Sequence, residues 1–258
     1  MLRSRITPVL LIHKNGLVKT VKFKDPKYVG DPLNAVRIFN EKEVDELIVI
    51  DIDRSSQGLT PDFTLIEKMA SECRMPLCYG GGIKTPEEAL KLVNLGVEKV
   101  AMSSALVDQP NLAKEMADAV GQQSVVAVLD IKKSGWNKKY RLFTNNGKNE
   151  IKSDPFDLAL ELQSIGVGEI VVNSIDNDGT MTGYDMKLNE KMRDLLDLPI
   201  TFLGGAGNLN DIRQLIDVFG PVGAAAGSLF VFKGKYRAVL INYPGEKDKY
   251  ALYNQSAE

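Results

Sequence analysis

The chain has 258 residues, 44% of them apolar and 26% charged, which is enough to bury the core of one large globular domain or two small ones. Its formal charge of −2, without a Lys/Arg cluster set apart from acidic residues, offers no electrostatic footprint for nucleic acid. No apolar run approaches the roughly 18 to 20 residues of a membrane span, and PVLLI is too short for a signal peptide. We therefore expect a cytoplasmic protein without a membrane partner. Two cysteines and one histidine make no ligand set, so neither a metal nor a cofactor is implied.

Short apolar runs alternate with segments of helical period along the whole chain. In chain order, the predicted strands cover 5–12, 46–51, 76–81, 99–104, 124–130, 169–174, 199–205 and 223–230. Between them, apolar residues recur at intervals of three and four, as in DPLNAVRIFNEKEV and DFTLIEKMASEC, which predicts helices. Eight such units predict an α/β fold, a single (β/α)8 barrel over 1–244, followed by a loose tail over 245–258. A doubly wound open sheet remains the alternative, because periodicity does not show closure.

The two halves of the chain resemble each other. VDELIVIDID (44–53) matches VGEIVVNSID (167–176), YGGGIKTPEEAL (79–90) matches LGGAGNLNDIRQL (203–215), and AMSSAL (101–106) matches AAGSLF (225–230). Each half is too small to bury its apolar faces alone. The repeat therefore predicts a barrel built from two duplicated half-barrels.

Small residues gather where ligands bind in such barrels, at the C-terminal ends of the strands. The third and seventh strands end in glycines, and the fourth and eighth end in small or hydroxyl residues: Gly80, Gly81, Gly82, Gly204, Gly205, Gly207, Ser103, Ser104, Gly227 and Ser228. Glycine allows backbone N–H groups to approach a phosphate closely. The matched positions predict two phosphate cradles and a ligand with a phosphate at each end. The alternative is that the glycines only relieve tight turns.

The loop SIDNDGTMTGYD (174–185) follows the sixth predicted strand and is polar. Asp178 and Gly179 have the spacing to hold a phosphate through backbone N–H groups. An ordinary turn stabilised by an aspartate side chain has the same spacing and stays open as the alternative.

The motifs VDELIVIDID, YGGGIKTPEEA, VVAVLDIKK, SIDNDGTMTGYD and FLGGAG occur in order from about Arg5 to Phe232 and together resemble the cyclase subunit of imidazole glycerol phosphate synthase. The resemblance implies a duplicated (β/α)8 barrel with a class I glutaminase docked at its bottom. Ammonia would pass through the barrel to a bisphosphorylated ribulosyl substrate at the top. Phosphate contacts are implied at Gly82, Ser103, Ser104, Asp178, Gly179, Gly205, Gly227 and Ser228.

The resemblance also implies a ring of charged side chains that closes the barrel bottom as an ammonia gate. The matching positions are Arg5, Glu46, Lys99 and Glu169, and all four have the expected charge. Each begins a predicted strand, where buried charges must pair with one another. Ion pairing for stability alone is the alternative reading.

At the top, the family uses two strand-end aspartates as general acid and base. Asp130 matches the second, whereas setting LIHK (11–14) against LDIK (129–132) puts Ile12 at the first. Isoleucine exchanges no proton. Loss of a catalytic carboxyl commonly lowers the rate by a factor of about 10²–10⁴. Two further catalytic candidates are Lys19, which matches a lysine of the family's mobile first loop, and His13, which on a strand would point away from the side of Ile12.

Two functions remain open, and with them whether the chain is itself an enzyme. In the first, the chain is a divergent paralogue that receives ammonia and passes it to an acceptor, with a third, sugar-amidotransferase partner that forms an acetamidino sugar for surface polysaccharide such as lipopolysaccharide. VKTVKFKDPKYVGDP and GKYRAVLINYP resemble that subgroup. In the second, it is a genuine cyclase of histidine biosynthesis, a lyase that uses Asp130 alone or with His13.

Overall fold

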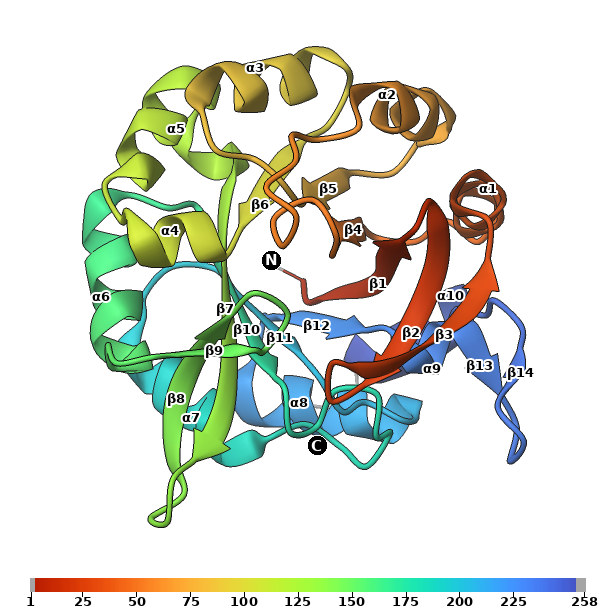
Figure 1. Cartoon of the computed structure of the whole chain (residues 1–258). Helices are drawn as coiled ribbons and strands as arrows, with labels where there is room; N and C mark the ends of the chain where they lie inside the picture. The colour runs from red at the N-terminus through yellow and green to blue at the C-terminus, as the bar shows by residue number, and fades with distance from the viewer. Residues whose placement is uncertain (1–2, 254–258) are drawn as a thin grey trace.

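A closed ring of eight parallel strands forms the centre of the protein, viewed along the barrel in Figure 1. The computed structural model describes residues 3–253. The barrel strands are β1 (Arg5–His13), β4 (Leu47–Asp51), β5 (Leu77–Gly80), β6 (Lys99–Met102), β7 (Val125–Ser134), β10 (Glu169–Ser174), β11 (Ile200–Leu203) and β12 (Gly223–Ala226). Each pairs in parallel with the next, and β12 pairs with β1, so the ring is complete. The predicted barrel is confirmed, and the open sheet is excluded.

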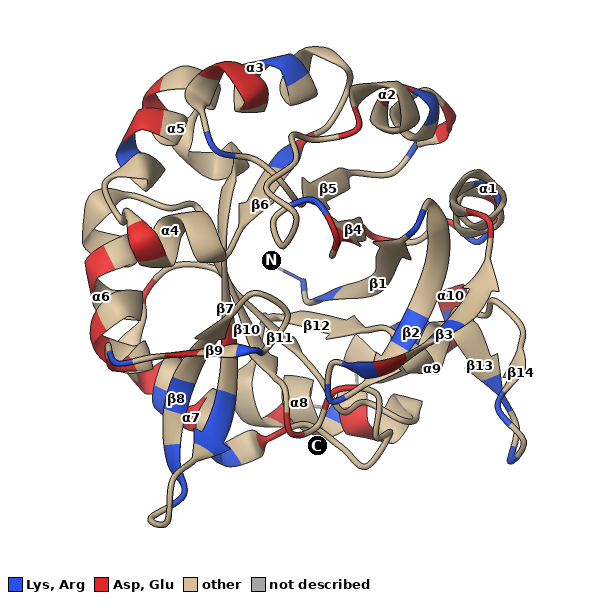
Figure 2. Cartoon of the chain, in the orientation of Figure 1, with Lys and Arg blue, Asp and Glu red and all other residues tan. Residues whose placement is uncertain are grey.

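Helices surround the strands and bury the apolar stripes that the sequence predicts. They are α1 (Pro32–Glu41), α2 (Phe63–Glu72), α3 (Pro86–Asn94), α5 (Leu112–Val120), α6 (Pro155–Ile165), α7 (Met186–Leu195), α8 (Leu209–Phe219) and α10 (Glu246–Tyr253). Charged residues lie mainly on these helices and on the loops, while most of the barrel wall is uncharged (Figure 2). Within residues 3–253, no helix is both long and apolar enough to cross a membrane.

The ends of two predicted strands differ from the structure. The segment 223–230 is strand only to Ala226, and Ser228–Val231 forms the short helix α9. Likewise, β6 stops at Met102 before the short helix α4 (Ser104–Asp108). The backbone leaves the extended conformation at Ser103 and Gly227, with ψ values of −83° and −70°. The apolar runs continue past these turns because the short helices bury Leu106 and Phe230.

The expectation of a loose tail is wrong for residues 246–253, which form α10, the eighth helix of the barrel wall. Leu252 is buried, and Lys249 Nζ lies 2.9 Å from Asp45 Oδ1 just before β4. A small hairpin of β13 (Phe232–Lys233) and β14 (Ala238–Val239) separates this helix from the last strand. The hairpin and the weak amphipathic pattern of α10 hid the helix from sequence reasoning. The rest of the predicted tail, 254–258, lies outside the described residues.

The two halves carry the same extension, which supports the predicted duplication. β1 continues into an antiparallel hairpin with β2 (Gly16–Val21) and β3 (Lys24–Gly30). β7, the first strand of the second half, continues into β8 (Lys139–Thr144) and β9 (Asn149–Ile151), and the short 3-10 helix η1 (Gln122–Ser124) precedes it. Both hairpins rise from the C-terminal ends of their barrel strands, so they flank the mouth of the barrel (Figure 1).

Side chains alternate along each barrel strand between two separate cores. On β1, Ile6, Leu10 and Ile12 are buried among the helices. Val9 belongs instead to an apolar layer inside the barrel, together with Ile48, Cys78, Ala101, Val126, Val171 and Ala225. The interior is thus apolar at mid-height, and its two ends carry the polar groups described below.

Replacing Leu252 by alanine should destabilise the protein by about 2 to 5 kcal/mol, because it leaves a cavity under the last barrel helix. Urea unfolding measures this change. Lys247→Ala, at an exposed position of the same helix, serves as the control for altered helix propensity. Equal stability of the two variants would show that α10 does not hold the barrel together.

Candidate functional site at the barrel mouth and floor

A cavity of about 150 Å³ lies at the C-terminal ends of the barrel strands, where the sequence predicts the site. Both hairpins and the loops after β4, β5 and β6 contribute to its wall. It brings together many of the predicted site residues, namely Lys19, Gly82, Ser103, Ser104, Asp130, Asp178 and Gly227. Others of the predicted set do not line it: His13, Gly179, Gly205 and Ser228.

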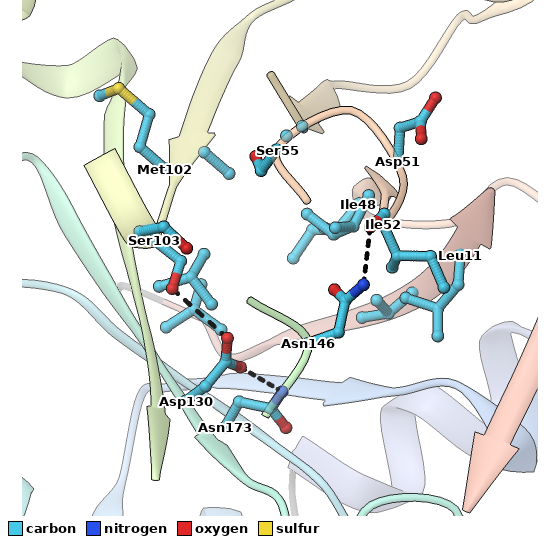
Figure 3. Close-up of a pocket in the computed structure, with 18 of the residues that line it drawn as sticks. Leu11, Ile48, Asp51, Ile52, Ser55, Met102, Ser103, Asp130, Asn146 and Asn173 are labelled. Carbon is cyan, nitrogen blue, oxygen red and sulfur yellow. Dashed lines mark hydrogen bonds between the residues drawn. The ribbon is translucent and has the colours of Figure 1, made fainter. Parts of the chain in front are cut away.

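Asp130 projects from β7 into this cavity (Figure 3). Its Oδ1 accepts a hydrogen bond from Asn173 Nδ2 at 2.8 Å, and its Oδ2 accepts one from Ser103 Oγ at 3.4 Å. Burial outweighs both bonds and raises the pKa of Asp130 to about 7. A carboxyl that titrates near neutral pH can both take and give a proton. Sequence reasoning missed Asn173, although a polar residue inside the apolar strand EIVVNS was a signal for it.

Leu11, not Ile12, stands where the first carboxylate would be, which corrects the sequence alignment. Leu11 pairs with Ile50 across β1 and β4, as Asp130 pairs with Asn173 across β7 and β10. Ile50 and Asn173 hold the same place in the repeated segments 44–53 and 167–176. Leu11 lines the cavity on the side away from Asp130 (Figure 3), while Ile12 is buried among the helices. The alignment was off by one residue, and in a strand one residue reverses the direction of the side chain.

Leu11 makes the wall opposite Asp130 apolar. Ile48 and Ile50 continue this wall along β4. Asp51 also borders the cavity, but its carboxylate accepts from Arg54 Nε at 3.3 Å and from the backbone N–H of Asp53 at 3.0 Å. The mouth therefore holds a titratable carboxyl at the second acid position and a leucine at the first.

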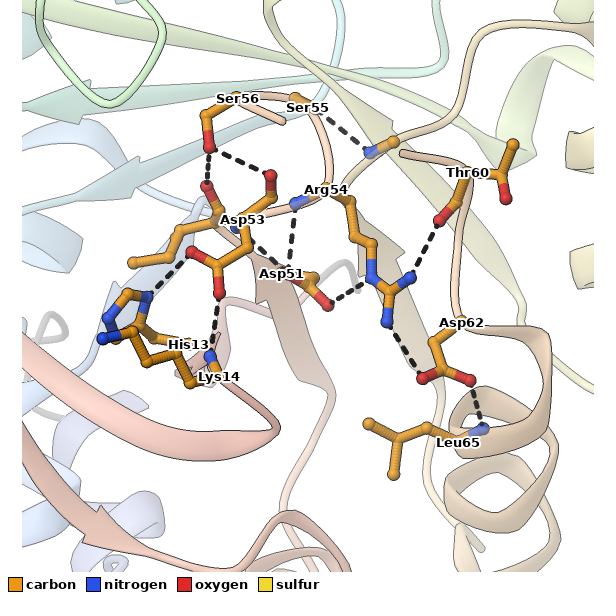
Figure 4. A network of polar contacts seen from close by, with 12 residues as sticks. His13, Lys14, Asp51, Asp53, Arg54, Ser55, Ser56, Thr60, Asp62 and Leu65 are labelled. Atoms are coloured by element: carbon orange, nitrogen blue, oxygen red, sulfur yellow. Dashed lines mark hydrogen bonds and ion pairs between the residues drawn. The ribbon is translucent and has the colours of Figure 1, made fainter. Parts of the chain in front are cut away.

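His13 is turned away from the cavity. Its Nδ1 lies 2.8 Å from Asp53 Oδ1, and the backbone N–H of Lys14 donates to Asp53 Oδ2 at 2.8 Å (Figure 4). Asp53 thus ties the turn between β1 and β2 to the loop after β4. These contacts with Asp53 give His13 a packing role, which is the alternative to a catalytic role at this position.

Lys19 enters the cavity from β2 and is buried. Its Nζ donates to the backbone carbonyl of Val9, in the barrel wall. Burial lowers the pKa of Lys19 to about 8, although the nearby Asp178 carboxylate opposes the shift. Gly227 leaves the room for the ammonium group, since a Cβ there would collide with Nζ. Lys19 and Asp130 therefore share one cavity and both titrate close to neutral pH.

The first predicted cradle lies at Gly82, Ser103 and Ser104. Gly82 has φ +78°, and a Cβ there would come within 2.5 Å of the carbonyl oxygen of Leu59. Its N–H donates to Ser55 Oγ at 3.0 Å, so an anion at this position would take the place of that hydroxyl. The loop geometry therefore requires glycine at this position, which lines the cavity.

The second predicted cradle lies beside β2 and differs from the expectation at one residue. A Cβ on Gly179 would meet the carbonyl of Thr20, and one on Gly205 would meet that of Gly183. The N–H of Asp178 is already bonded to Ser174 O at 2.9 Å, and its Oδ2 accepts from Thr20 Oγ1 at 3.1 Å. Asp178 therefore holds β2 over the loop and has no free N–H for a phosphate.

At the barrel floor, the four predicted charges form a closed ring. Arg5 lies 3.1 Å from Glu46 and 2.6 Å from Glu169, and Lys99 lies 2.7 Å from Glu46 and 2.9 Å from Glu169. Burial favours neutral Glu169, but Arg5 and Lys99 hold the pKa of Glu169 below its usual value. Thr201, which sequence reasoning missed, donates a hydrogen bond to Glu169 at 2.5 Å. The ring is neutral and satisfies its own charges.

Stability should depend on pH through Asp130. The unfolded carboxyl titrates near its ordinary value of 3.8 and the folded one at about 7, so the folded state binds more protons between these values. Relative to Asp130→Asn, wild-type stability should fall between about pH 4 and 7, by at most about 1.4 kcal/mol per pH unit, and then level off. Urea unfolding across this range measures the effect. The plot of unfolding free energy against pH for Asp118→Asn, which changes an exposed carboxyl, should run parallel to that of wild type. If the plot for Asp130→Asn also ran parallel to wild type, the raised pKa of Asp130 would be contradicted.

Comparison with known proteins identifies the family of this chain. The family model described as "Histidine biosynthesis protein" matches residues 5–237. "Putative imidazole glycerol phosphate synthase subunit hisF3" of Vibrio vulnificus (strain YJ016) is 56% identical over 96% of both chains. "Putative imidazole glycerol phosphate synthase subunit hisF2" of Pseudomonas aeruginosa (strain PAO1) is 50% identical over 95% of this chain and 97% of its own.

A third relative is more distant. "Imidazole glycerol phosphate synthase subunit HisF" of Petrotoga mobilis is 35% identical over 92% of this chain and 94% of its own. Together with the barrel, the floor ring and the cavity at the mouth, these matches show that the chain belongs to the histidine biosynthesis protein family, as a divergent relative of the HisF subunit of imidazole glycerol phosphate synthase.

Proposed function

We propose that this chain is the ammonia-receiving synthase subunit of a cytoplasmic glutamine amidotransferase complex, and that it passes ammonia to a phosphorylated acceptor without closing an imidazole ring. The observation that carries the proposal is the contrast between the two ends of the barrel. The floor keeps a complete ring of four charges, whereas the mouth has Leu11 where its two-fold partner is Asp130.

The floor ring supports a partner that delivers ammonia from below. The side chain of Arg5 is 32% exposed, so the ring faces the outside of the barrel bottom, where a class I glutaminase would dock. Above the ring the interior is lined by small or apolar side chains such as Ala101 and Ala225. Neutral ammonia needs no charged partner on such a path. Displacement of Lys99, which contacts both glutamates, would open the ring by breaking two ion pairs.

The mouth supports the transfer step. Ammonia that attacks an electrophilic carbon must lose a proton, and Asp130, with a pKa of about 7, accepts it without a large energetic cost. Lys19 supplies a positive charge beside Gly227 when it is protonated. The apolar wall at Leu11 lacks the second proton-transfer group that ring closure would use.

For the acceptor, we propose an N-acetylated amino sugar of surface-polysaccharide biosynthesis. With the help of a third, sugar-amidotransferase partner, the nitrogen would bind the acetamido carbon and the oxygen of that group would leave as water, which gives an acetamidino group. The stretches 18–32 and 234–244, which resemble those of the polysaccharide-associated subgroup, support this part of the proposal. The relatives at 56% and 50% identity have the numbered names hisF3 and hisF2, while the Petrotoga mobilis HisF subunit reaches 35%. The chain is thus more similar to those two proteins than to the Petrotoga mobilis subunit.

The second candidate function is the cyclase reaction of histidine biosynthesis. It is favoured by Asp130 and Lys19, which share the cavity, and by the glycines at both cradles. A direct assay separates the two functions: purified protein receives ammonium and the bisphosphorylated ribulosyl substrate. Formation of imidazole glycerol phosphate at a rate typical of metabolic enzymes would refute the first function.

Leu11→Asp should raise cyclase activity by about 10²–10⁴ over wild type, because it restores a second carboxyl opposite Asp130. The matched control is Ile12→Asp, which puts the same group into the core under the helices and should destabilise the protein without a gain. Product formation and thermal unfolding are measured for both. A folded Leu11→Asp variant without any gain would show that other changes at the mouth suppress the reaction.

Lys99→Met should change glutamine-dependent turnover and spare turnover with added ammonium, because it alters the ring that ammonia from the glutaminase must cross. The variant leaves two buried glutamates with one cation, at a cost of about 3 to 5 kcal/mol, so assays run well below its unfolding temperature. Lys114→Met, which breaks an exposed ion pair, is the control. A loss of equal size with both nitrogen sources would exclude a gate at this ring.

A further inference from the structure

The β13–β14 hairpin brings a cation to the second cradle that the sequence analysis did not assign. This hairpin lies between the last barrel strand and α10, and it is rich in Lys and Arg (Figure 2). Within it, Arg237 turns back toward the barrel mouth, whereas Lys233 and Lys235 are exposed.

Contacts from three directions fix the guanidinium of Arg237. Its Nη2 donates to the carbonyl oxygen of Gly179 at 2.9 Å and to Ser228 Oγ at 3.4 Å. Its Cζ lies 5.0 Å from the ring centre of Phe232, and Lys27 Nζ lies 5.3 Å from the same ring. Gly179 and Ser228 are both residues of the predicted second cradle. The loop after β10 and the start of α9 thus both hold Arg237 at the cradle.

The hydrogen bonding of this guanidinium is incomplete. Its Nε is buried, and among residues 3–253 it has no hydrogen-bond partner. The ion pairs of the described residues give Arg237 no carboxylate either. A buried N–H of a cation without an acceptor is costly, and phosphate oxygens are strong acceptors for guanidinium N–H groups.

The first cradle has a different electrostatic environment. There the nearby arginine, Arg54, is already paired with Asp51 at 3.3 Å and with Asp62 at 3.0 Å. A phosphate at the first cradle would therefore meet neutral N–H and O–H donors. At the second cradle it would meet a cation that is not neutralised.

We propose that Arg237 is a phosphate-binding residue that supplies a cation to the second cradle beside Gly179 and Ser228, in addition to Lys19 beside Gly227. Its ligand is the phosphate monoester end of a phosphorylated small molecule, which would accept hydrogen bonds from the guanidinium. This inference rests on the proposed function only in that the acceptor carries a phosphate. It makes the two cradles unequal, with the tighter binding at the second.

Inorganic phosphate is a sufficient probe, because the inference concerns the phosphate group alone. Titration of labelled protein, followed by NMR shifts of individual backbone amides, reports each cradle separately: Gly179, Gly205 and Ser228 for the second, Gly82 and Ser103 for the first. Arg237→Met removes the cation, and Arg237→Lys keeps the charge without the fork. Lys235→Met removes one charge from an exposed position of the same hairpin.

In Arg237→Met, we expect the dissociation constant at the second cradle to rise about tenfold or more, with the first cradle unchanged. Arg237→Lys should lie between this variant and wild type, and Lys235→Met should match wild type. An unchanged constant in Arg237→Met would overturn the inference, since Arg237 would then only fasten the hairpin. Equal weakening by Arg237→Met and Lys235→Met would overturn it too, in favour of the general charge of the hairpin.

The wild-type titration separates this inference from the proposed function. Phosphate binding at the first cradle alone refutes the role of Arg237 and leaves a phosphorylated acceptor in place. Binding at neither cradle refutes both. Unfolding temperatures of all variants show whether a lost response reflects a lost fold, and Arg237→Lys provides a folded comparison if Arg237→Met is unstable.

Discussion

Closure of the barrel is the constraint on which every other feature of this protein depends. Once β12 pairs with β1 and β7 pairs with β10, each strand must divide its side chains between the core under the helices and the interior of the ring. Four strands then bring Arg5, Glu46, Lys99 and Glu169 within ion-pair distance at the floor. These charges are far apart in the sequence and meet only because the sheet closes.

The same division gives the two ends of the barrel different side chains. The interior keeps its charged floor and apolar middle, whereas the mouth combines a titratable carboxyl at Asp130 with an apolar wall at Leu11. A carboxyl with a pKa of about 7 and an amine with a pKa of about 8, at Lys19, make a pocket suited to proton transfer. What this pocket lacks is the second acid opposite Asp130, and this lack shapes the proposed transfer of ammonia to a different acceptor.

Much of this organisation could be predicted from the sequence, and the misses have physical causes. Strand positions and the repeat followed from apolar runs and from motifs that match between the two halves, whereas the ring residues followed from the resemblance to the cyclase family. The position of the missing acid was misassigned to Ile12, because letters in an alignment do not show side-chain direction. The helix α10 was missed because its amphipathic pattern is weak. Asn173 and Thr201 were missed because their importance lies in the carboxylates they contact, Asp130 and Glu169.

The sequence by itself determined the eight alternating units, the duplication and the types of charge at each strand end, since these follow from the period and order of residues along the chain. Only the tertiary structure decided that Leu11 faces the cavity, that His13 is bound to Asp53, and that Arg237 reaches Gly179 and Ser228. Those outcomes depend on strand register and on contacts between distant loops. Such contacts form only when the closed barrel fixes where each strand ends.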